Sequence, residues 1–291
     1  MSPLAERPSE PDIARAYREC AAITRRSGSS FASAFWMLPK PKRNALHAIY
    51  AFCRLADDIA DDPSVAGDRV ALLARWRDEL DGAYRGKARH PVGVALSDAV
   101  ERYRLPERIF LDLLAGVEFD LSEGPIDSFD DLRLYCYRVA STVGLLVVRI
   151  LGFRDPRSLE FAETLGVAVQ LTNVLRDVHV DARGGRIYLP GDEFARFALS
   201  RESVLAGELS DGLRLMLSFN AKRTAGYYAR ADALLPDEDR RSLRPAIAMG
   251  RIYRALLDEL VARDFPRLDA PLRISKPRRL AIAAKVWMGM A

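Results

Sequence analysis

Residues 50–61 of this chain read YAFCRLADDIAD, a stretch whose apolar side chains recur every three or four positions. That periodicity predicts an amphipathic helix. Tyr50, Arg54, Asp57 and Asp61 then fall at spacings of four, three and four residues, so they share one helix face. Two carboxylates one turn apart repel each other by roughly 0.2–0.5 kcal/mol. A cation held between them would offset this repulsion.

The same arrangement returns about 120 residues later, where residues 170–181 read QLTNVLRDVHVD. Gln170, Asn173, Asp177 and Asp181 again lie on one face of a predicted helix. Both acidic pairs come near the C-terminus of their helix, where the helix dipole makes a carboxylate unfavourable by roughly 0.3–1 kcal/mol. A positive group is therefore expected at both places.

Oxygen ligands of this kind, without histidine or cysteine beside them, favour Mg²⁺ over zinc. Magnesium keeps several waters and is usually shared with the phosphates of a substrate. The alternative interpretation is that both clusters are solvated helix ends. It predicts near-neutral effects for Asp57→Ala and Asp177→Ala, whereas the metal interpretation predicts loss of function.

Helical periodicity continues through nearly the whole chain, and no run of alternating β-branched residues bounded by turns is found. The fold class is therefore predicted to be all-α. No low-complexity linker or internal repeat divides the 291 residues, so one domain over 1–291 is expected, with about 1–11 as a flexible tail. The predicted helices cover about 39–63, two shorter segments opened by Pro91 and Pro106, 128–151, 156–181, 201–233, 237–263 and 277–288.

Composition narrows the class of protein. Apolar residues make up 49% and charged residues 29%, which is ordinary for a soluble chain, and the net charge of +4 does not favour nucleic acid as a partner. Three scattered cysteines form no CxxC pair and favour a reducing cytoplasm. No signal segment is recognised. The apolar stretches Val143–Leu151 and Leu280–Ala291 are shorter than the about 20 residues that span a bilayer. A cytoplasmic location is predicted.

The C-terminal segment mixes basic and apolar side chains. This pattern is compatible with an amphipathic helix at the inner face of the membrane, although charges that flank an ordinary packing helix are more common. A peripheral membrane contact is thus one of two interpretations. The side chains concerned are Arg273, Lys276, Arg278, Arg279 and Lys285 on the basic side, and Leu280, Ile282, Val286 and Trp287 on the apolar side.

Four motifs in this order resemble the squalene and phytoene synthases. Residues 50–61 resemble the first aspartate-rich motif of that family, and residues 170–190 resemble the second. Residues 135–144, YCYRVASTVG, are similar to its central helix. Ser29-Ser30-Phe31, followed by Leu38-Pro39, is similar to its N-terminal substrate flap. The resemblance implies the isoprenoid synthase fold, a single-domain helical bundle whose two acidic motifs face each other across a central apolar cavity.

The resemblance also implies a reaction, the head-to-head (1′–1) condensation of two isoprenoid diphosphates with two or three Mg²⁺ ions. Tyr135 matches the tyrosine thought to steer the carbocation or to assist proton removal. A phenol with an ordinary pKa of about 10 is a poor base, so cation–π stabilisation, or proton removal by the released diphosphate, stays open. The metal residues carried over, also counted as catalytic where they are aspartates, are Asp57, Asp61, Asn173, Asp177 and Asp181. The residues carried over to the diphosphates are Ser30, Phe31, Tyr50, Arg54, Gln170, Asn173, Arg176 and Arg186.

One departure from the family pattern lies in the second motif. The acid that usually stands before the last aspartate is replaced by Val180, and the small residue before it by His179. Asp177 and Asp181 remain, so metal binding is expected to survive. For His179 the sequence favours a solvated position near the helix end, with a diphosphate contact as the alternative.

The product is predicted from finer resemblances. The runs 135–149, 39–43 and 249–254 look most like bacterial presqualene diphosphate synthases of the hopanoid route. The substrates would then be two molecules of farnesyl diphosphate. No Gly-rich dinucleotide fingerprint is visible, so NADPH is not expected. A phytoene or dehydrosqualene synthase is the alternative enzyme, and a non-catalytic assembly factor of the same fold is the alternative class. No oligomeric state is indicated.

The interior of the predicted central helix allows two interpretations as well. Ala140, Val143, Gly144 and Val147, beside Ser141, mix small and branched side chains. They would leave room for a prenyl chain in a dry cavity, which an allylic cation needs because water would quench it. Alternatively, Gly144 would allow a neighbouring helix to approach closely.

Overall fold

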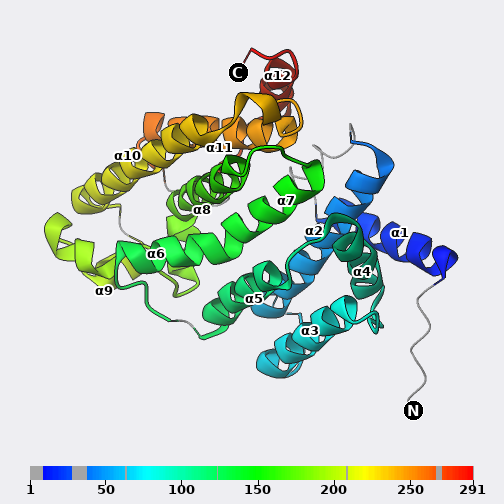
Figure 1. The fold of residues 1–291 in the computed structure, drawn as a ribbon. Helices are drawn as coiled ribbons and strands as arrows, with labels where there is room; N and C mark the ends of the chain where they lie inside the picture. Colours follow the sequence, from blue (N-terminus) through cyan, green and yellow to red (C-terminus); the bar gives the residue numbers. More distant parts are fainter. Residues whose placement is uncertain are drawn as a thin grey trace. The chain divides into compact units, whose positions relative to one another are not determined.

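The computed structural model describes residues 9–27, 38–62, 64–122, 124–207, 209–266 and 271–290. Throughout these ranges the regular structure is helical, without a β-strand, which confirms the all-α fold class. The predicted flap residues Ser30 and Phe31 lie outside the described residues. The helices (Figure 1) are α1 (Glu10–Arg26), α2 (Lys40–Asp61), α3 (Arg69–Tyr84), α4 (Pro91–Tyr103), α5 (Glu107–Ser122), α6 (Phe129–Cys136), the π-helix η2 (Tyr137–Ser141), α7 (Thr142–Leu151), α8 (Arg157–Arg183), the 3₁₀-helix η3 (Gly191–Phe197), α9 (Arg201–Leu205), α10 (Asp211–Leu234), the 3₁₀-helix η4 (Asp237–Asp239), α11 (Arg244–Ala262) and α12 (Lys276–Trp287).

These helices group into two compact units. The first comprises Met1–Ser122 together with Leu145–Gly152, and the second comprises Glu123–Gly144 together with Phe153–Ala291. The chain therefore crosses between the units within the single helix α7. A single domain over residues 1–291 stays a prediction.

The first unit is built around α2. Helices α1, α4 and α5 pack on it, and α3 packs on α4 and α5 (Figure 1). Phe52 is fully buried, stacks on Trp76 with ring centroids 5.1 Å apart, and meets the edge of Phe110 at 5.5 Å. The Trp76 Nε1 group also donates a hydrogen bond to the Phe52 carbonyl at 3.2 Å. Aromatic contacts of this kind contribute beyond their buried area, and they hold α2 in place.

The boundaries of α2 agree with the prediction that prolines mark its start and its end. Pro39 and Pro41 stand at its start, where a missing N–H costs nothing, and it ends at Asp61, two residues before Pro63. The flexible tail predicted for about residues 1–11 extends slightly too far, because α1 already begins at Glu10, with Pro11 in its first turn. Burial of Tyr17 and Cys20 against the unit stabilises α1 from its second turn onward.

The second unit is built around α8, a 27-residue helix against which α10, α11 and η2 pack. The Thr172 and Tyr228 hydroxyls share a hydrogen bond of 2.9 Å between α8 and α10. Asp239, only 1% exposed, accepts hydrogen bonds from the Arg154 and Asp155 amides and from the Ser158 hydroxyl. A buried carboxylate thus ties the N-terminus of α8 to the segment between α10 and α11.

The predicted helix over 128–151 exists, with one irregular turn. Ser128 opens it with a capping box shared with Asp131. The π-helix η2 then interrupts it, and the Ser141 hydroxyl there donates to the Glu163 carbonyl of α8 at 2.6 Å. A Cβ atom on Gly144 would stand 2.9 Å from the Ala162 carbonyl. At Gly144 the structure therefore confirms close helix packing rather than room for a prenyl chain.

Two predicted helices are shorter than expected. The segment 201–233 divides into α9 and α10, because Gly207 adopts φ +70° between them and Ser210 caps α10 by accepting the Leu213 N–H at 3.2 Å. The segment 237–263 begins as the 3₁₀ turn η4, and α11 starts only at Arg244. Local hydrogen bonds at these turns outweigh the helical periodicity of the sequence.

Among the described residues, one helix is long and apolar enough to cross a membrane by length and composition alone, the 23-residue stretch Phe129–Leu151. Just over half of its 18-residue apolar window is buried within the protein. The core helix of a soluble protein has the same properties. In α12, Val286 is buried and Ile282 and Trp287 are half-buried, while Leu280 is 70% exposed. Much of the apolar face predicted for a membrane therefore packs within the second unit, next to α11.

Candidate active site

The first acidic motif, residues 50–61, occupies the C-terminal end of α2, as its spacing predicts. Arg54 pairs with Asp58 at 2.6 Å, so the guanidinium neutralises a carboxylate outside the Asp57/Asp61 pair. Arg69, at the start of α3, donates to the carbonyl oxygens of Ile59 at 3.2 Å and Asp62 at 3.1 Å, and also to that of Ala60. This guanidinium supplies part of the positive charge that the helix dipole requires there.

The charged form of the Asp57 carboxylate is disfavoured by its surroundings. Its side chain keeps access to solvent, but the protein packed around it weakens the hydration of its charged form, and Asp61 and Asp120 repel that form further. Together these effects raise the pKa of Asp57 to about 7. Asp120 lies on α5, close to the end of that helix. The first unit thus gathers carboxylates from two helices where a divalent cation would relieve their repulsion.

Tyr50 lies on the predicted face but is already engaged. Its hydroxyl donates a hydrogen bond to the Ser27 hydroxyl, at the end of α1, at 2.8 Å. This bond ties the segment before the predicted flap to α2. A contact of Tyr50 with a diphosphate stays a prediction, and it would require this hydroxyl to be shared or released.

The second acidic motif lies in the last three turns of α8. Arg176 donates to both carboxylate oxygens of Asp177, from Nε at 2.7 Å and from a terminal nitrogen at 2.5 Å. Burial disfavours the charged guanidinium, but Asp177 and the Tyr253 hydroxyl on α11 outweigh it and raise the pKa of Arg176. A planar, permanently charged group is therefore held beside a predicted metal ligand, in the geometry suited to phosphate oxygens.

Asn173 provides the sharpest indication of a missing ligand. Its amide nitrogen donates to the Gln170 side-chain oxygen at 3.0 Å. Its own side-chain oxygen is buried and has no hydrogen-bond partner among the residues that the structure describes. An unsatisfied buried acceptor costs about 1–3 kcal/mol. A cation would satisfy this oxygen, one turn before Asp177.

Asp181 and Arg186 stand on either side of the turn that follows α8. The Arg186 amide donates to the Asp181 carbonyl at 2.9 Å, and both residues line a narrow crevice with Tyr188. The Tyr188 ring stacks on Tyr135 of α6, with centroids 4.9 Å apart and planes at 20°. Within the second unit, the buried Tyr135 therefore contacts the second motif through the Tyr188 ring.

The expectation of a solvated His179 is wrong. His179 is only 6% exposed, because it points from α8 into the second unit, whereas Val180 next to it is exposed. The replacement of the usual acid by Val180 therefore leaves an apolar side chain at the surface. Helical periodicity is the signal for this orientation, because His179 follows the buried Leu175 by four residues and so lies on the same face of α8.

The two acidic motifs hold the candidate metal ligands. Within the described residues no three His, Cys, Asp or Glu side chains form a ready-made metal site. The donor set nevertheless fits Mg²⁺, because this ion is typically held by one or two carboxylates, with water and substrate phosphates as its other ligands. The oxygen of Asn173 and the clustered carboxylates around Asp57 are the donors concerned.

Three residues that interact with these motifs were not predicted from the sequence. Asp120 comes to Asp57 from another helix, and Arg69 comes to the end of α2 from the start of the next one. Tyr253 reaches Arg176 from α11. Only Tyr253 lies in a run that resembled the family, residues 249–254. Asp120 and Arg69 belong to no spacing pattern, so tertiary structure alone reveals them.

Comparisons with known proteins agree with this picture. The chain is 34% identical to phytoene synthase 1 (chloroplastic) of Arabidopsis thaliana over 92% of its own length, spanning 65% of that relative, about two thirds. It is also 34% identical to 15-cis-phytoene synthase of Synechococcus elongatus, over 87% of this chain and 86% of that protein.

Solved structures resemble it over nearly the whole chain. A dehydrosqualene synthase is 29% identical with a TM-score of 0.84, covering 96% of this chain and 98% of that one. The squalene synthase HpnC of Alicyclobacillus acidocaldarius is 27% identical with a TM-score of 0.79, covering 89% and 98%. The sequence model described as squalene/phytoene synthase matches residues 24–279, which include both acidic motifs. The chain belongs to the squalene/phytoene synthase family.

Proposed function

We propose that this protein is a prenyltransferase that condenses two isoprenoid diphosphates head to head. The observation that carries the proposal is the family match over residues 24–279, within which both pairs of helix-borne aspartates are retained. Two of the curated relatives are named phytoene synthases, and two of the similar structures are named dehydrosqualene synthase and squalene synthase.

The acidic motifs would hold two or three Mg²⁺ ions, through Asp57 and Asp61 in the first unit and Asn173, Asp177 and Asp181 in the second. Bound Mg²⁺ would neutralise the charge that develops on the departing diphosphate. The orphaned oxygen of Asn173 and the mutual repulsion around Asp57 support these assignments. Asp120 would add a further carboxylate to the first motif.

The cationic side chains would bind and orient the diphosphates. Arg176 presents a planar guanidinium, kept charged by Asp177 and Tyr253. Arg54 and Arg186 would act similarly, together with Gln170, Tyr50, Ser30 and Phe31. Preorganised positive groups stabilise a leaving group without reorganising during the reaction. Tyr135, buried and stacked on Tyr188, would steer the cation with the face of its ring.

For the product we propose presqualene diphosphate. One farnesyl diphosphate loses its diphosphate, the 2,3-double bond of the other attacks the resulting C1 cation, and loss of a proton closes a cyclopropane ring. Both similar structures are named for C30 products, dehydrosqualene and squalene. The hopanoid route, farnesyl specificity and the absence of an NADPH requirement all belong to this proposal.

Phytoene synthesis from two geranylgeranyl diphosphates is the second candidate. It is favoured by the names of the curated relatives, which are phytoene synthases at 33–36% identity. The two candidates use the same acidic motifs. They differ in the length of the prenyl chain and in whether the product keeps a diphosphate.

A product assay separates these candidates. Purified protein is incubated with Mg²⁺ and either farnesyl or geranylgeranyl diphosphate, without NADPH, and the products are analysed by mass spectrometry. A C30 product that still bears a diphosphate supports presqualene diphosphate synthesis. Phytoene from the C20 substrate, or a C30 hydrocarbon, contradicts it and supports the corresponding alternative.

The same assay addresses the non-catalytic alternative. Asp57→Ala should abolish turnover of either substrate, whereas Asp62→Ala, which removes the exposed acid beside the motif, should retain it. If wild-type protein turned over neither substrate, and Asp57→Ala left the cellular phenotype unchanged, an assembly role would replace catalysis.

A cytoplasmic protein with a peripheral contact at the inner face of the membrane remains part of the proposal. Exposed Leu280, Met288 and Met290, with Lys276 and Lys285 nearby, would supply that contact. Co-sedimentation with liposomes compares the full chain with a version truncated after Ser275. Equal binding by both would dispose of the contact.

A further inference from the structure

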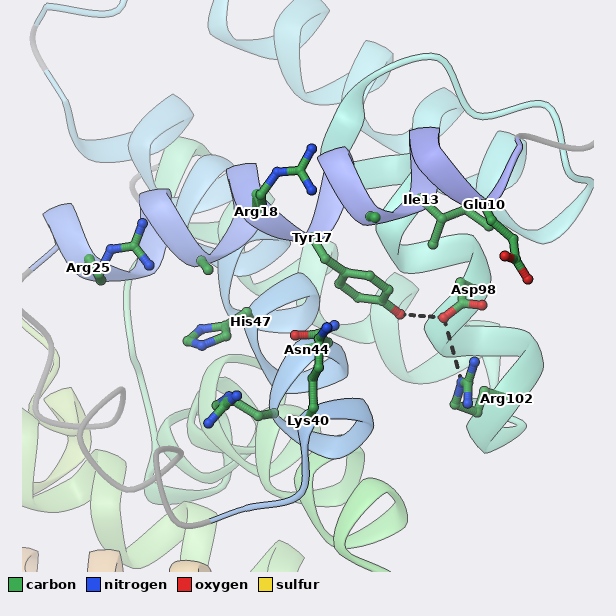
Figure 2. A pocket seen from close by; sticks show the side chains of 13 residues that line it. Glu10, Ile13, Tyr17, Arg18, Arg25, Lys40, Asn44, His47, Asp98 and Arg102 are labelled. Atoms are coloured by element: carbon green, nitrogen blue, oxygen red, sulfur yellow. Dashed lines mark hydrogen bonds and ion pairs between the residues drawn. The ribbon is translucent and has the colours of Figure 1, made fainter.

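A second concave site lies at the other end of α2, away from the acidic motif. It is a cavity of about 860 Å³ within the first unit, between α1, the N-terminal half of α2, and α4 (Figure 2). This volume is in the range of sites for small molecules. His47, the lining residue nearest to the motif on α2, precedes Asp57 by ten residues, about 15 Å along a helix. The cavity is therefore distinct from the proposed metal ligands.

Positive charge dominates its walls. Two of the lining residues are acidic, Glu10 and Asp98, and Asp98 is already engaged by the Tyr17 hydroxyl at 2.6 Å and by Arg102 at 3.6 Å (Figure 2). Against them stand five cationic side chains, Arg18, Arg25, Lys40, Arg43 and Arg102. Like charges gathered around one space repel, so an anion in that space would lower the energy of the unit.

The side chains of three of these cations have no partner among the residues that the structure describes. Arg18 and Arg25 on α1 and Lys40 on α2 form no hydrogen bond or ion pair within the described part of the chain. Elsewhere in the protein, exposed arginines commonly pair with a carboxylate, as Arg85 does with Asp81 at 2.8 Å. Guanidinium and ammonium groups that have no partner within the described ranges are available to bind an external anion.

The start of α2 strengthens the positive field. Its first turn contains Lys40, Lys42 and Arg43 but no acidic residue, and no side chain caps it. This is the reverse of the usual preference, because the N-terminus of a helix already carries a partial positive charge. Consistently, burial together with Arg43 and Arg25 lowers the pKa of His47 to about 4.

The cavity is also lined by apolar groups. Ala21 contributes apolar surface. So do Ile13 and the Tyr17 ring, while Asn44 adds an amide (Figure 2). Guanidinium and ammonium groups gathered at one cavity match the oxygens of a phosphate group. We propose that this cavity binds a phosphate-bearing anion at a site separate from the catalytic one. The phosphate comes either from free diphosphate, which the proposed reaction releases, or from the headgroup of an anionic lipid.

The test measures binding of two probes to the full chain in EDTA, where diphosphate has no Mg²⁺ to bridge it to the acidic motifs. Inorganic diphosphate is titrated by calorimetry, and vesicles of phosphatidylcholine with or without phosphatidic acid are used in flotation. The variant Arg18→Gln/Arg25→Gln/Lys40→Gln should lower affinity for the bound probe at least tenfold. Arg15→Gln/Arg26→Gln/Arg75→Gln removes the same charge from exposed positions outside the cavity and should change affinity less than twofold.

The outcomes are distinct. Binding of diphosphate that depends on the cavity cations assigns the site to a soluble phosphate, and binding of phosphatidic acid vesicles alone assigns it to a lipid headgroup. No binding of either probe, or equal losses in both triple variants, overturns the proposal. If the cavity variant fails to fold, Lys40→Gln and the charge-retaining Arg18→Lys/Arg25→Lys replace it, and only Lys40→Gln should weaken binding. Because neither substrate nor Mg²⁺ is present, the result is independent of the proposed synthase activity.

Discussion

Gly166 of α8 lies directly against Ser141 of the π-helix η2, so that a Cβ atom on Gly166 would stand 2.4 Å from the Ser141 Cα. Only a residue without a side chain allows this approach, since real Cβ atoms essentially never come so near to backbone atoms. The contact places the irregular turn of the central helix against the helix that carries the second acidic motif. π-Helical turns are frequent at functional sites.

Gly166→Ala is therefore expected to destabilise the protein by about 1–3 kcal/mol, the usual range for overpacking, and to reduce turnover by displacing η2. Chemical denaturation and steady-state kinetics measure both effects. Gly226→Ala in α10 is the matched control, because no atom lies within 4 Å of its Cβ position. There the gain in helix propensity should stabilise by up to about 1 kcal/mol. Equal effects at the two glycines would contradict the packing argument.

The variant Asn173→Leu should affect Mg²⁺ binding but have little effect on stability. Because the side-chain oxygen of Asn173 is buried without a partner among the described residues, its removal should cost little stability. The Mg²⁺ concentration for half-maximal turnover should rise at least tenfold. Asn220 is the control, since it donates to the Met216 carbonyl at 3.1 Å and accepts from Arg223 at 2.9 Å. Asn220→Leu should lower stability by about 2 kcal/mol without a selective change in Mg²⁺ dependence.

Protonation of Asp57 should couple stability to pH. Its pKa is about 7 in the folded protein, above the ordinary value of 3.8, so the folded state retains a proton that the unfolded state has lost. Stability attributable to this group is therefore full below about pH 4 and declines as the pH rises towards 7. The melting temperature of wild-type protein relative to Asp57→Asn, without divalent metal, should fall across this window. Parallel curves for the two proteins would rule out the assigned shift.

Binding of Mg²⁺ should reverse the pH dependence of stability that Asp57 causes. Because a metal ligand must be deprotonated, binding of Mg²⁺ near pH 6 should release protons and recover stability. Calorimetry in two buffers of different ionisation enthalpy counts the protons released. Asp57→Asn should release fewer protons than wild type, whereas Asp62→Asn should behave like wild type because Asp62 is an exposed acid that pairs locally with Ser64.

The contribution of Asp239 to stability should change with pH in the opposite direction to that of Asp57. Burial disfavours its charge, but hydrogen bonds from Ser158 and from the Asp155 and Arg154 amides outweigh burial and lower its pKa. Asp239→Ala leaves those donors unsatisfied and should destabilise by about 3 kcal/mol. The advantage of wild type over Asp239→Asn should persist above about pH 4 and disappear as the pH falls further. Asp237→Asn, which affects an exposed pair with Arg240, should change stability by less than about 0.5 kcal/mol.

Local signals in the sequence predicted much of the fold. The prolines before α2 and α4 and the capping residue before α6 are short-range features, so their helices begin where predicted. The errors occur where longer-range packing or local turn geometry outweighs periodicity, as at the Gly207 turn that divides the segment 201–233. The early start of α1 is of the same kind, because its burial against the first unit could not be inferred from a tail rich in proline and polar residues.

By itself, the sequence determined that the protein is helical and that Asp57/Asp61 and Asp177/Asp181 each share a helix face, because a helix places residues four apart on one side. Only the tertiary structure decided which groups from other helices meet them. Asp120 and Arg69 reach the first motif, and Tyr253 reaches Arg176, through packing between segments far apart or on different helices. Such contacts have no sequence period, since they depend on how whole helices pack and not on the spacing within one.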